Sequence, residues 1–168
     1  MEMEKFVEEY GKGLYAFCLY TTCNKEKAED LFQQTFLVLF EKNKLELDAN
    51  PKSYLISIAL NLWKNRLRKA ARRKRLADVS FVEDWELAQI ADEGDSVEEL
   101  VEKRQVAEKL RSCVLGLPEK LRLVVLMYYM EEMPIAEIAE VLRIPPGTVN
   151  SRLNKARKVL KERLDDGK

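Results

Sequence analysis

The chain has 168 residues, 29 of them basic and 29 acidic, so its formal net charge is zero. With 46% hydrophobic residues it has enough apolar material for real cores, and its length allows one compact domain or two small ones. The longest apolar run, Leu123 to Met130, is too short to span a bilayer, and the acidic, amphipathic N-terminus lacks the pattern of a secretion signal. We therefore expect a cytoplasmic protein that does not insert into a membrane.

The cysteine and histidine content narrows the chemistry. The three cysteines, Cys18, Cys23 and Cys113, are odd in number and show no C-x-x-C spacing, which argues against a disulfide framework. Zinc sites and acid-base catalysis draw heavily on histidine, and the chain has none. We expect no catalytic residue, no metal and no cofactor, and we interpret Cys18 and Cys113 as small core residues.

Periodic apolar residues predict two helices in the first third of the chain and a third that begins near Pro51, which suits a first helical turn. The first pattern comprises Phe6, Tyr10, Leu14 and Phe17, and the second Ala28, Leu31, Phe32, Thr35, Phe36 and Leu39. The core face expected for the third helix is Leu55, Ile58, Ala59 and Leu62.

The third helix also carries a polar stripe. Residues 61–75, NLWKNRLRKAARRKR, hold eight Lys or Arg residues and no acid. Amides can bond base edges and guanidiniums can hold phosphates, so this face suits a nucleic acid. A solvated basic face is the alternative, but positive charge unrelieved by any acid favours nucleic-acid contact. The stripe is Asn61, Asn65, Arg68 and Arg72, at steps of four, three and four, with Lys64 and Lys69 beside it.

The sign of the charge changes abruptly after this helix. Ten acidic and no basic residues lie between Asp78 and Glu102, as expected at a domain boundary. Strand signals are missing throughout. We predict an all-α fold with two small helical domains joined by a flexible acidic linker, the C-terminal one a four-helix domain with a helix-turn-helix. The expected boundaries are 1–76, 77–98 for the linker, and 99–168.

Residues 134–164 predict a short helix, a tight turn at 143–145, and a longer helix opened by Pro146. The expected buried residues are Ile135, Ile138, Ala139 and Leu142 in the first helix, then Val149, Leu153, Ala156 and Leu160 in the second. Such helix pairs also serve as supports in bundles, but no acid occurs from Arg143 to Lys161. The geometry and charge are those of a recognition helix in a DNA major groove.

Four segments in this order resemble the extracytoplasmic-function (ECF) sigma factors, the small promoter-recognition subunits of bacterial RNA polymerase. They are AEDLFQQTFLVLF (28–40), PKSYLISIALNLWKNRLRKAARR (51–73), LPEKLRLVVLMYY (117–129) and EIAEVLRIPPGTVNSRLNKARKVL (137–160). The resemblance implies binding to core RNA polymerase and promoter DNA, and a cognate anti-sigma factor that is often membrane-bound.

The resemblance also implies residue roles. Core polymerase would contact Asp30, Leu31, Gln33 and Phe36. Melted −10 DNA would contact Asn61, Lys64, Asn65, Arg68 and Arg72, with a specificity loop within 42–54. Apart from the resemblance, Tyr54 and Trp63 are candidates for stacking on bases, with a core or half-buried position as the alternative for each. The −35 duplex would contact Gly147, Asn150, Ser151, Arg152, Asn154, Lys155 and Arg157.

The chain departs from the family pattern at the helix-turn-helix. Arg143 stands at a turn position where the family often has Gly, so we expect either a strained left-handed residue or a different turn. Pro145 replaces a common capping Ser. Asn154 and Lys155 stand where His and Arg are frequent, which bears on the promoter sequence rather than on the family.

Two other functions remain as alternatives. A free-standing regulator could bind DNA through 134–164 and use its N-terminal half to dimerise or to sense a ligand, but it would leave the stripe of the third helix unexplained. A recombinase or nuclease would need clustered carboxylates at metal-binding spacing or an activated Ser or Tyr, and the sequence offers neither.

Overall fold

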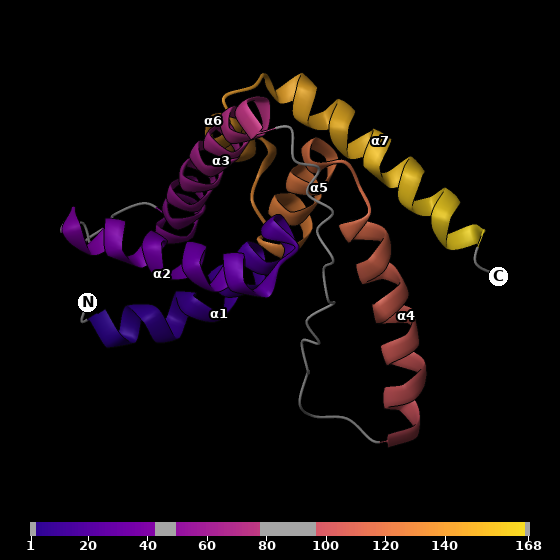
Figure 1. Cartoon of the computed structure of the whole chain (residues 1–168). Coiled ribbons are helices and arrows are strands. Elements are labelled where there is room, and N and C mark those ends of the chain that lie inside the picture. The colour runs from indigo at the N-terminus through magenta and orange to yellow at the C-terminus, as the bar shows by residue number, and fades with distance from the viewer. Residues whose placement is uncertain (1–2, 43–49, 78–96, 167–168) are drawn as a thin grey trace. The chain divides into compact units, whose positions relative to one another are not determined.

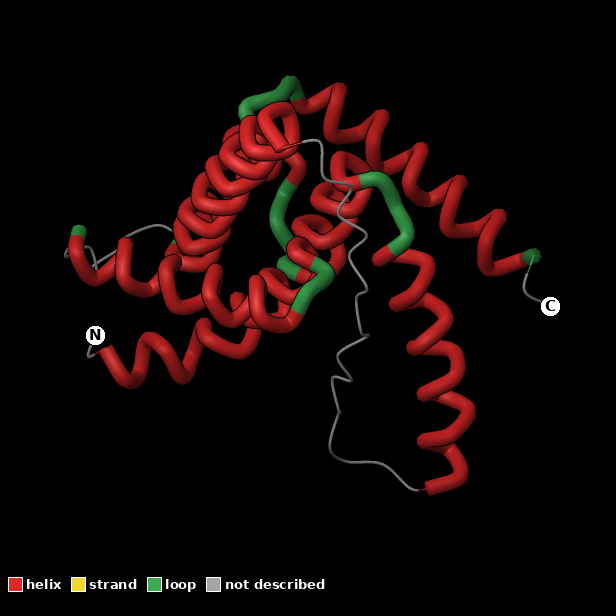
Figure 2. The backbone as a smooth tube through the Cα atoms, in the orientation of Figure 1, coloured by secondary structure: helices red, strands yellow, loops and turns green. Residues whose placement is uncertain are grey.

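The computed structural model describes residues 3–42, 50–77 and 97–166, without the side chains of 74–77 and 97–100. All regular structure in these ranges is helical, which confirms the all-α prediction (Figures 1 and 2). The helices are α1 (Met3–Thr22), α2 (Lys25–Glu41), α3 (Pro51–Ala77), α4 (Val97–Leu115), α5 (Glu119–Val125), the π-helical turn η1 (Leu126–Met130), α6 (Ile135–Leu142) and α7 (Pro146–Asp165).

Contacts between these helices divide the chain into two compact units, α1–α3 and α4–α7. Because η1 continues α5, the second unit has the four helical segments that were expected, ending in a helix-turn-helix. Helix α3 ends at Ala77 and α4 begins at Val97. Most of the proposed linker lies outside the described residues, so its flexibility and the two boundaries between the three segments stay predictions.

In the first unit, α1 and α2 run antiparallel and α3 crosses them (Figure 1). The side chain of Asn24 starts α2 by accepting a hydrogen bond from the Lys27 amide at 2.9 Å. Aromatic rings fill the space between α1 and α2, where Phe6 meets Phe36 edge to face at 6.4 Å. Most of the periodic residues predicted for these two helices are buried in this core, whereas Tyr10 and Phe32 are only half-buried.

The buried side of α3 is wider than the predicted face. Leu55, Ile58 and Ala59 are buried, but Leu62 is only half-buried. Further buried positions on the helix are Ile56, Leu60 and Trp63. The reason is that α3 contacts both α1 and α2, so the core covers more of its circumference than one i, i+3, i+4 stripe.

One arginine of the basic segment joins α3 to α2. The Arg66 Nη2 atom lies 2.6 Å from Asp30 Oδ2 and 2.6 Å from Gln34 Oε1. The Arg66 side chain is 25% exposed and that of Asp30 is 57% exposed, so water screens this ion pair and its contribution to stability is modest. Arg66 is thus directed at a neighbouring helix and not along the polar stripe.

In the second unit, α7 contacts α4, α5 and α6. Its far end is held by Lys109 of α4, whose Nζ donates to the Leu164 carbonyl oxygen at 3.0 Å. The fully buried positions on α7 are Val149, Leu153 and Ala156, as predicted, while Leu160 is half-buried. Among the described residues, no helix is both long enough and apolar enough to cross a membrane.

The turn of the helix-turn-helix is strained. Arg143 has φ 57° and ψ 46°, so of the two alternatives expected at this position the structure shows the strained left-handed residue. The amide of Arg143 donates to the Glu140 carbonyl and that of Ile144 to the Ala139 carbonyl, at 3.3 and 3.1 Å. This is the Schellman arrangement, in which Gly is the usual residue at the left-handed position. Pro145 then precedes α7 without any side-chain cap, as predicted.

We expect Arg143→Gly to stabilise the second unit by up to about 1 kcal/mol, because Gly adopts the left-handed conformation without a steric penalty. Amide hydrogen exchange of α6 and α7 measures this locally. The control is Arg143→Ala, which removes the side chain but keeps the strained Cβ. An equal gain in protection for the alanine variant would place the effect in the side chain and not in the backbone.

We expect Arg66→Met to destabilise the first unit by about 0.5 to 1 kcal/mol, since it removes a partly screened ion pair and keeps most of the aliphatic stem. In a Trp85→Phe background, Trp63 is the sole tryptophan and is buried on α3, so its fluorescence during urea unfolding reports on this unit. Arg68→Met is the matched control at an exposed position of the same helix. Equal destabilisation by both variants would contradict a specific role for Arg66.

Candidate nucleic-acid interface

The polar stripe of α3 is on the surface. Asn61, Asn65, Arg68 and Arg72 are exposed and Lys64 is half-buried. Their spacing places the two amides and the two guanidiniums along one side of the helix. The core holds the opposite side of α3, so its rotation is fixed and the stripe faces outward.

The two aromatic candidates on α3 differ in accessibility. Trp63 is 8% exposed and belongs to the core, so it offers no ring to a base. Tyr54 is half-buried in the first turn, where Asn50 accepts a hydrogen bond from the Ser53 amide at 3.3 Å. The specificity loop proposed within 42–54 falls largely on residues 43–49, which lie outside the described residues.

A second polar surface lies on α7. Gly147, Asn150, Ser151, Asn154, Lys155 and Arg157 are exposed there, and Arg152 is half-buried. A Cβ built at Gly147 meets nothing within 4 Å, so the backbone at the start of the helix is open to a close approach. Helix N-termini attract phosphate because their amides lack partners within the helix. The predicted −35 residues are therefore brought together on one helix.

Three side chains of this α7 surface, those of Ser151, Asn154 and Arg157, have local partners. The Ser151 hydroxyl donates to the Gly147 carbonyl at 3.0 Å. The Arg157 Nε atom donates to the hydroxyl of Tyr129 at 2.6 Å, and its Nη1 atom donates to Asn154 Oδ1 at 3.2 Å. The hydrogen bond with Tyr129 is the main cause that raises the pKa of Arg157.

Sequence reasoning missed the tyrosines. Tyr128 and Tyr129 lie in η1, with their ring centroids 5.7 and 5.6 Å from the Arg157 guanidinium carbon. In the sequence they lie near the end of the apolar run 123–130, and nothing in their spacing distinguishes an exposed ring from a core ring. Tyr129 is nevertheless 53% exposed.

The third predicted surface, on α2, is only partly exposed. Asp30 and Gln33 are on the surface, but Leu31 is 0% exposed and Phe36 only 6%. Side chains buried this deeply reach no partner from the observed fold, so they support the surface from within. Leu37, which is 59% exposed, follows Asp30 and Gln33 on the same side of α2. The sequence did contain a sign of this exposed residue, because Leu37 does not belong to the periodic apolar pattern predicted for the core face of this helix.

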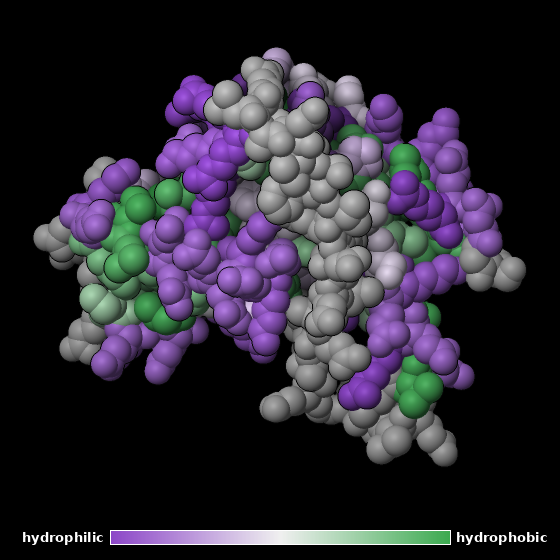
Figure 3. All heavy atoms as spheres, viewed as in Figure 1, coloured by the Kyte–Doolittle hydropathy of each residue, from purple (hydrophilic) through white to green (hydrophobic). Residues whose placement is uncertain are grey.

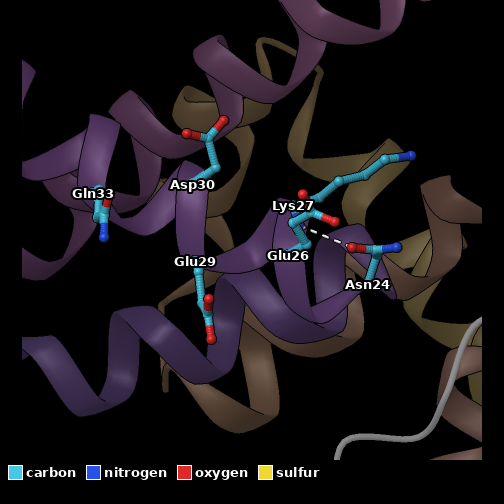
Figure 4. A pocket seen from close by; sticks show the side chains of 6 residues that line it. All are labelled: Asn24, Glu26, Lys27, Glu29, Asp30 and Gln33. Carbon is cyan, nitrogen blue, oxygen red and sulfur yellow. Dashed lines mark hydrogen bonds between the residues drawn. The ribbon is translucent and has the colours of Figure 1, made fainter.

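A shallow polar pocket adjoins this surface at the start of α2 (Figure 4). Asp30 points toward α3, where Arg66 binds it, whereas Glu29 points to the α1 side (Figure 4). The lining is Asn24, Glu26, Lys27, Glu29, Asp30 and Gln33. Among the described residues, no group of three potential His, Cys, Asp or Glu ligands could hold a metal ion.

Apolar side chains appear on the surface over the end of α2, and hydrophilic ones cover much of α3 and α7 (Figure 3).

Two family matches cover these surfaces. Residues 6–73 match Sigma-70 region 2, and residues 107–160 match Sigma-70 region 4. The first range contains α2 and the stripe of α3, and the second contains the helix-turn-helix with Arg157 and Tyr129.

Curated relatives agree along nearly the whole chain. The ECF RNA polymerase sigma factor SigW of Bacillus subtilis is 30% identical over 163 residues, which cover 95% of this chain and 87% of that protein. The RNA polymerase sigma factor HrpL of Pseudomonas syringae pv. syringae is 31% identical over 156 residues, covering 90% and 81%.

Solved structures share the fold. The sigma factor RpoE, solved in complex with the anti-sigma factor NepR from Bartonella quintana, has a TM-score of 0.78 at 21% identity and covers 96% of both chains. CnrH, solved in complex with the cytosolic domain of CnrY, has a TM-score of 0.63 at 21% identity, covering 98% of this chain and 88% of that one.

The amide and arginine stripe of α3 thus lies within a region 2 match, and the helix-turn-helix lies within a region 4 match of the same chain. This chain belongs to the extracytoplasmic-function sigma factors, which bind core RNA polymerase and direct it to specific promoters.

Proposed function

We propose that the three surfaces divide the work of promoter recognition. The stripe of α3 captures melted −10 DNA, the exposed side of α7 reads the −35 duplex, and the surface of α2 around Asp30, Gln33 and Leu37 contacts core polymerase. The observation that carries this proposal is the exposed order of two amides followed by two arginines on α3. A regulator that only binds duplex DNA has no use for such a stripe.

On α3, recognition is coupled to melting. Taking a base out of the stack costs a few kcal/mol, so melting is favoured only where the extruded base finds partners. Asn61 and Asn65 supply amide donors and acceptors for the edge of that base. Arg68 and Arg72, one and two turns further along, hold the backbone of the same strand. Half-buried Tyr54 offers part of its ring for stacking.

On α7, recognition uses the groove of intact duplex. The N-terminal half of the helix, with Asn150 and Ser151, approaches base edges, as in other helix-turn-helix proteins. The exposed backbone at Gly147 lets the helix start come close to a phosphate. Further along, Arg152, Asn154, Lys155 and Arg157 meet backbone or base acceptors. These contacts are all non-covalent, and we propose no catalytic role for any residue of the chain.

A protein partner could regulate the chain by covering its polymerase-binding surface on α2. RpoE and CnrH, which share this fold, were solved with protein partners, NepR in one case and a domain of CnrY in the other. We propose that a cognate anti-sigma factor, soluble or membrane-bound, covers the polymerase-binding surface of α2 until a signal removes it. The protein acts where polymerase and promoters are, in the cytoplasm.

Initiation by a bacterial core RNA polymerase on a pool of random promoter sequences, with and without the protein, tests the proposal. We expect transcripts only with the protein, from templates that share two spaced upstream motifs. Sequence-specific binding to duplex by the protein alone, without any gain in initiation, would favour the free-standing regulator. Metal-dependent DNA cleavage would favour an enzyme.

Two variants separate the DNA-contacting surfaces. We expect Asn61→Ala to lower initiation on duplex promoters about fivefold to thirtyfold, as for one or two lost hydrogen bonds. The loss should persist on a template melted in advance with mismatches, because Asn61 contacts the extruded base itself.

Lys155→Ala should instead lower affinity for the −35 duplex and reduce the salt slope by about one. A −35 defect in the Asn61 variant would contradict this division.

A further inference from the structure

The tyrosine pair of η1 is not accounted for by the proposed contacts. Tyr129 leaves 53% of its surface exposed, although a buried ring would contribute more to folding. The two residues lie in a π-helical turn that interrupts the regular helix, a feature often found at functional sites. An exposed Tyr129 with a half-buried Tyr128, next to the helix proposed to read DNA, therefore calls for a specific role.

Both rings face one guanidinium. Their centroids lie 4.9 Å apart at an interplanar angle of 84°, and the Arg157 guanidinium carbon lies at nearly equal distance from both, 5.7 and 5.6 Å. Ring faces attract cations, so each ring limits where the arginine can go. The Arg157 side chain is therefore confined while it remains on the surface.

Hydrogen bonds fix the orientation as well as the place. The Arg157 Nε atom donates to the Tyr129 hydroxyl at 2.6 Å, which sets the direction of the guanidinium plane. Nη1 donates to Asn154 Oδ1 at 3.2 Å. Arginine only donates, so the Asn154 oxygen is the acceptor and its NH₂ group is directed elsewhere. One tyrosine hydroxyl thus orders two side chains of the predicted −35 surface.

We propose that Tyr129 is a positioning residue of the −35 interface, whose hydroxyl holds Arg157, and through it Asn154, in the geometry that meets DNA. This inference rests on the proposed DNA contact of Arg157. A free arginine loses its rotamer freedom when it binds, whereas one already ordered loses less, so the restraint raises affinity. The bonds to Tyr129 and Asn154 use two of the five guanidinium N–H groups, and the other three remain to donate to phosphate or guanine.

The opposite role makes the opposite prediction. If the tyrosines kept Arg157 away from DNA, loss of the hydroxyl would release the arginine and tighten binding. If Tyr129 only supported the fold, its loss would change affinity together with stability. The experiment therefore needs variants at both residues and a measure of folding.

The full-length protein is assembled with core polymerase, and affinity is measured at several salt concentrations. The templates are a promoter recovered from the random pool and the same promoter with its −35 motif scrambled. Wild type is compared with Tyr129→Phe, Arg157→Ala and the double variant. Tyr15→Phe, a half-buried tyrosine of α1, is the matched control for loss of a hydroxyl. Hydrogen exchange of α7 checks that the second unit remains folded.

For Tyr129→Phe we expect a threefold to tenfold loss of affinity, about that of one weakened charged hydrogen bond, and only on the promoter with an intact −35 motif. The salt slope should fall toward that of Arg157→Ala, although Tyr129→Phe changes no charge. The double variant should bind no more weakly than Arg157→Ala alone. Exchange in α7 and the affinity of Tyr15→Phe should equal wild type.

Three results would overturn the inference while leaving the proposed function in place. In the first, Tyr129→Phe binds with wild-type affinity while Arg157→Ala binds more weakly. In the second, Tyr129→Phe binds more tightly than wild type. In the third, the losses of affinity of the two single variants add up in the double variant. Wild-type affinity for Arg157→Ala would remove both the assigned DNA contact of Arg157 and the positioning role. This outcome can be told from the other three, because only here does Arg157→Ala bind with wild-type affinity.

Discussion

The display of polar side chains to DNA depends on how tightly the other side of each helix is buried. On α7, Val149, Leu153 and Ala156 are 0%, 1% and 0% exposed, and such a stripe lets the helix rotate very little. The cations and amides between these positions have only one direction left to point. On α3, contact with two helices fixes the rotation in the same way. Recognition and folding therefore rest on the same apolar burial.

The same constraint explains why a strained turn is tolerated. Helices α6 and α7 pack against each other, and only residues 143–145 separate them, so the chain has to turn within three residues. Arg143 takes the left-handed conformation, at a cost of about 1 to 2 kcal/mol for a residue with a Cβ. Two Schellman hydrogen bonds offset part of that cost, and two prolines fix the backbone where α7 begins.

Periodicity and punctuation made much of the fold predictable from the sequence. The all-α class, the helix-turn-helix and the start of α3 near Pro51 all follow from local rules that tertiary contacts did not override. At Arg143 local rules left two alternatives, and the structure shows the left-handed one. Predictions of exposure were less successful, because exposure depends on which helices pack around a residue and not only on its spacing along the helix. Leu31 and Phe36 matched a family interface but are buried in the core of the first unit, where α2 packs against α1 and α3. The exposed alternative, Leu37, is visible only once the helices are packed.

Arginines illustrate the limit most clearly, since their long side chains reach partners that no periodicity encodes. Arg66 and Arg68 are two residues apart in one acid-free segment, yet Arg66 binds Asp30 and Gln34 of α2 while Arg68 is exposed. Arg157 is likewise held by a residue 28 positions earlier, in a turn whose π-helical geometry no local rule foretold. Counting the charge of a basic surface therefore overstates the cations it can offer to DNA at once. A neighbouring residue that binds a cation can hold it away from DNA, as Asp30 and Gln34 hold Arg66, or can orient it toward DNA, as we propose for Arg157. The direction in which the neighbour lies determines which of the two occurs.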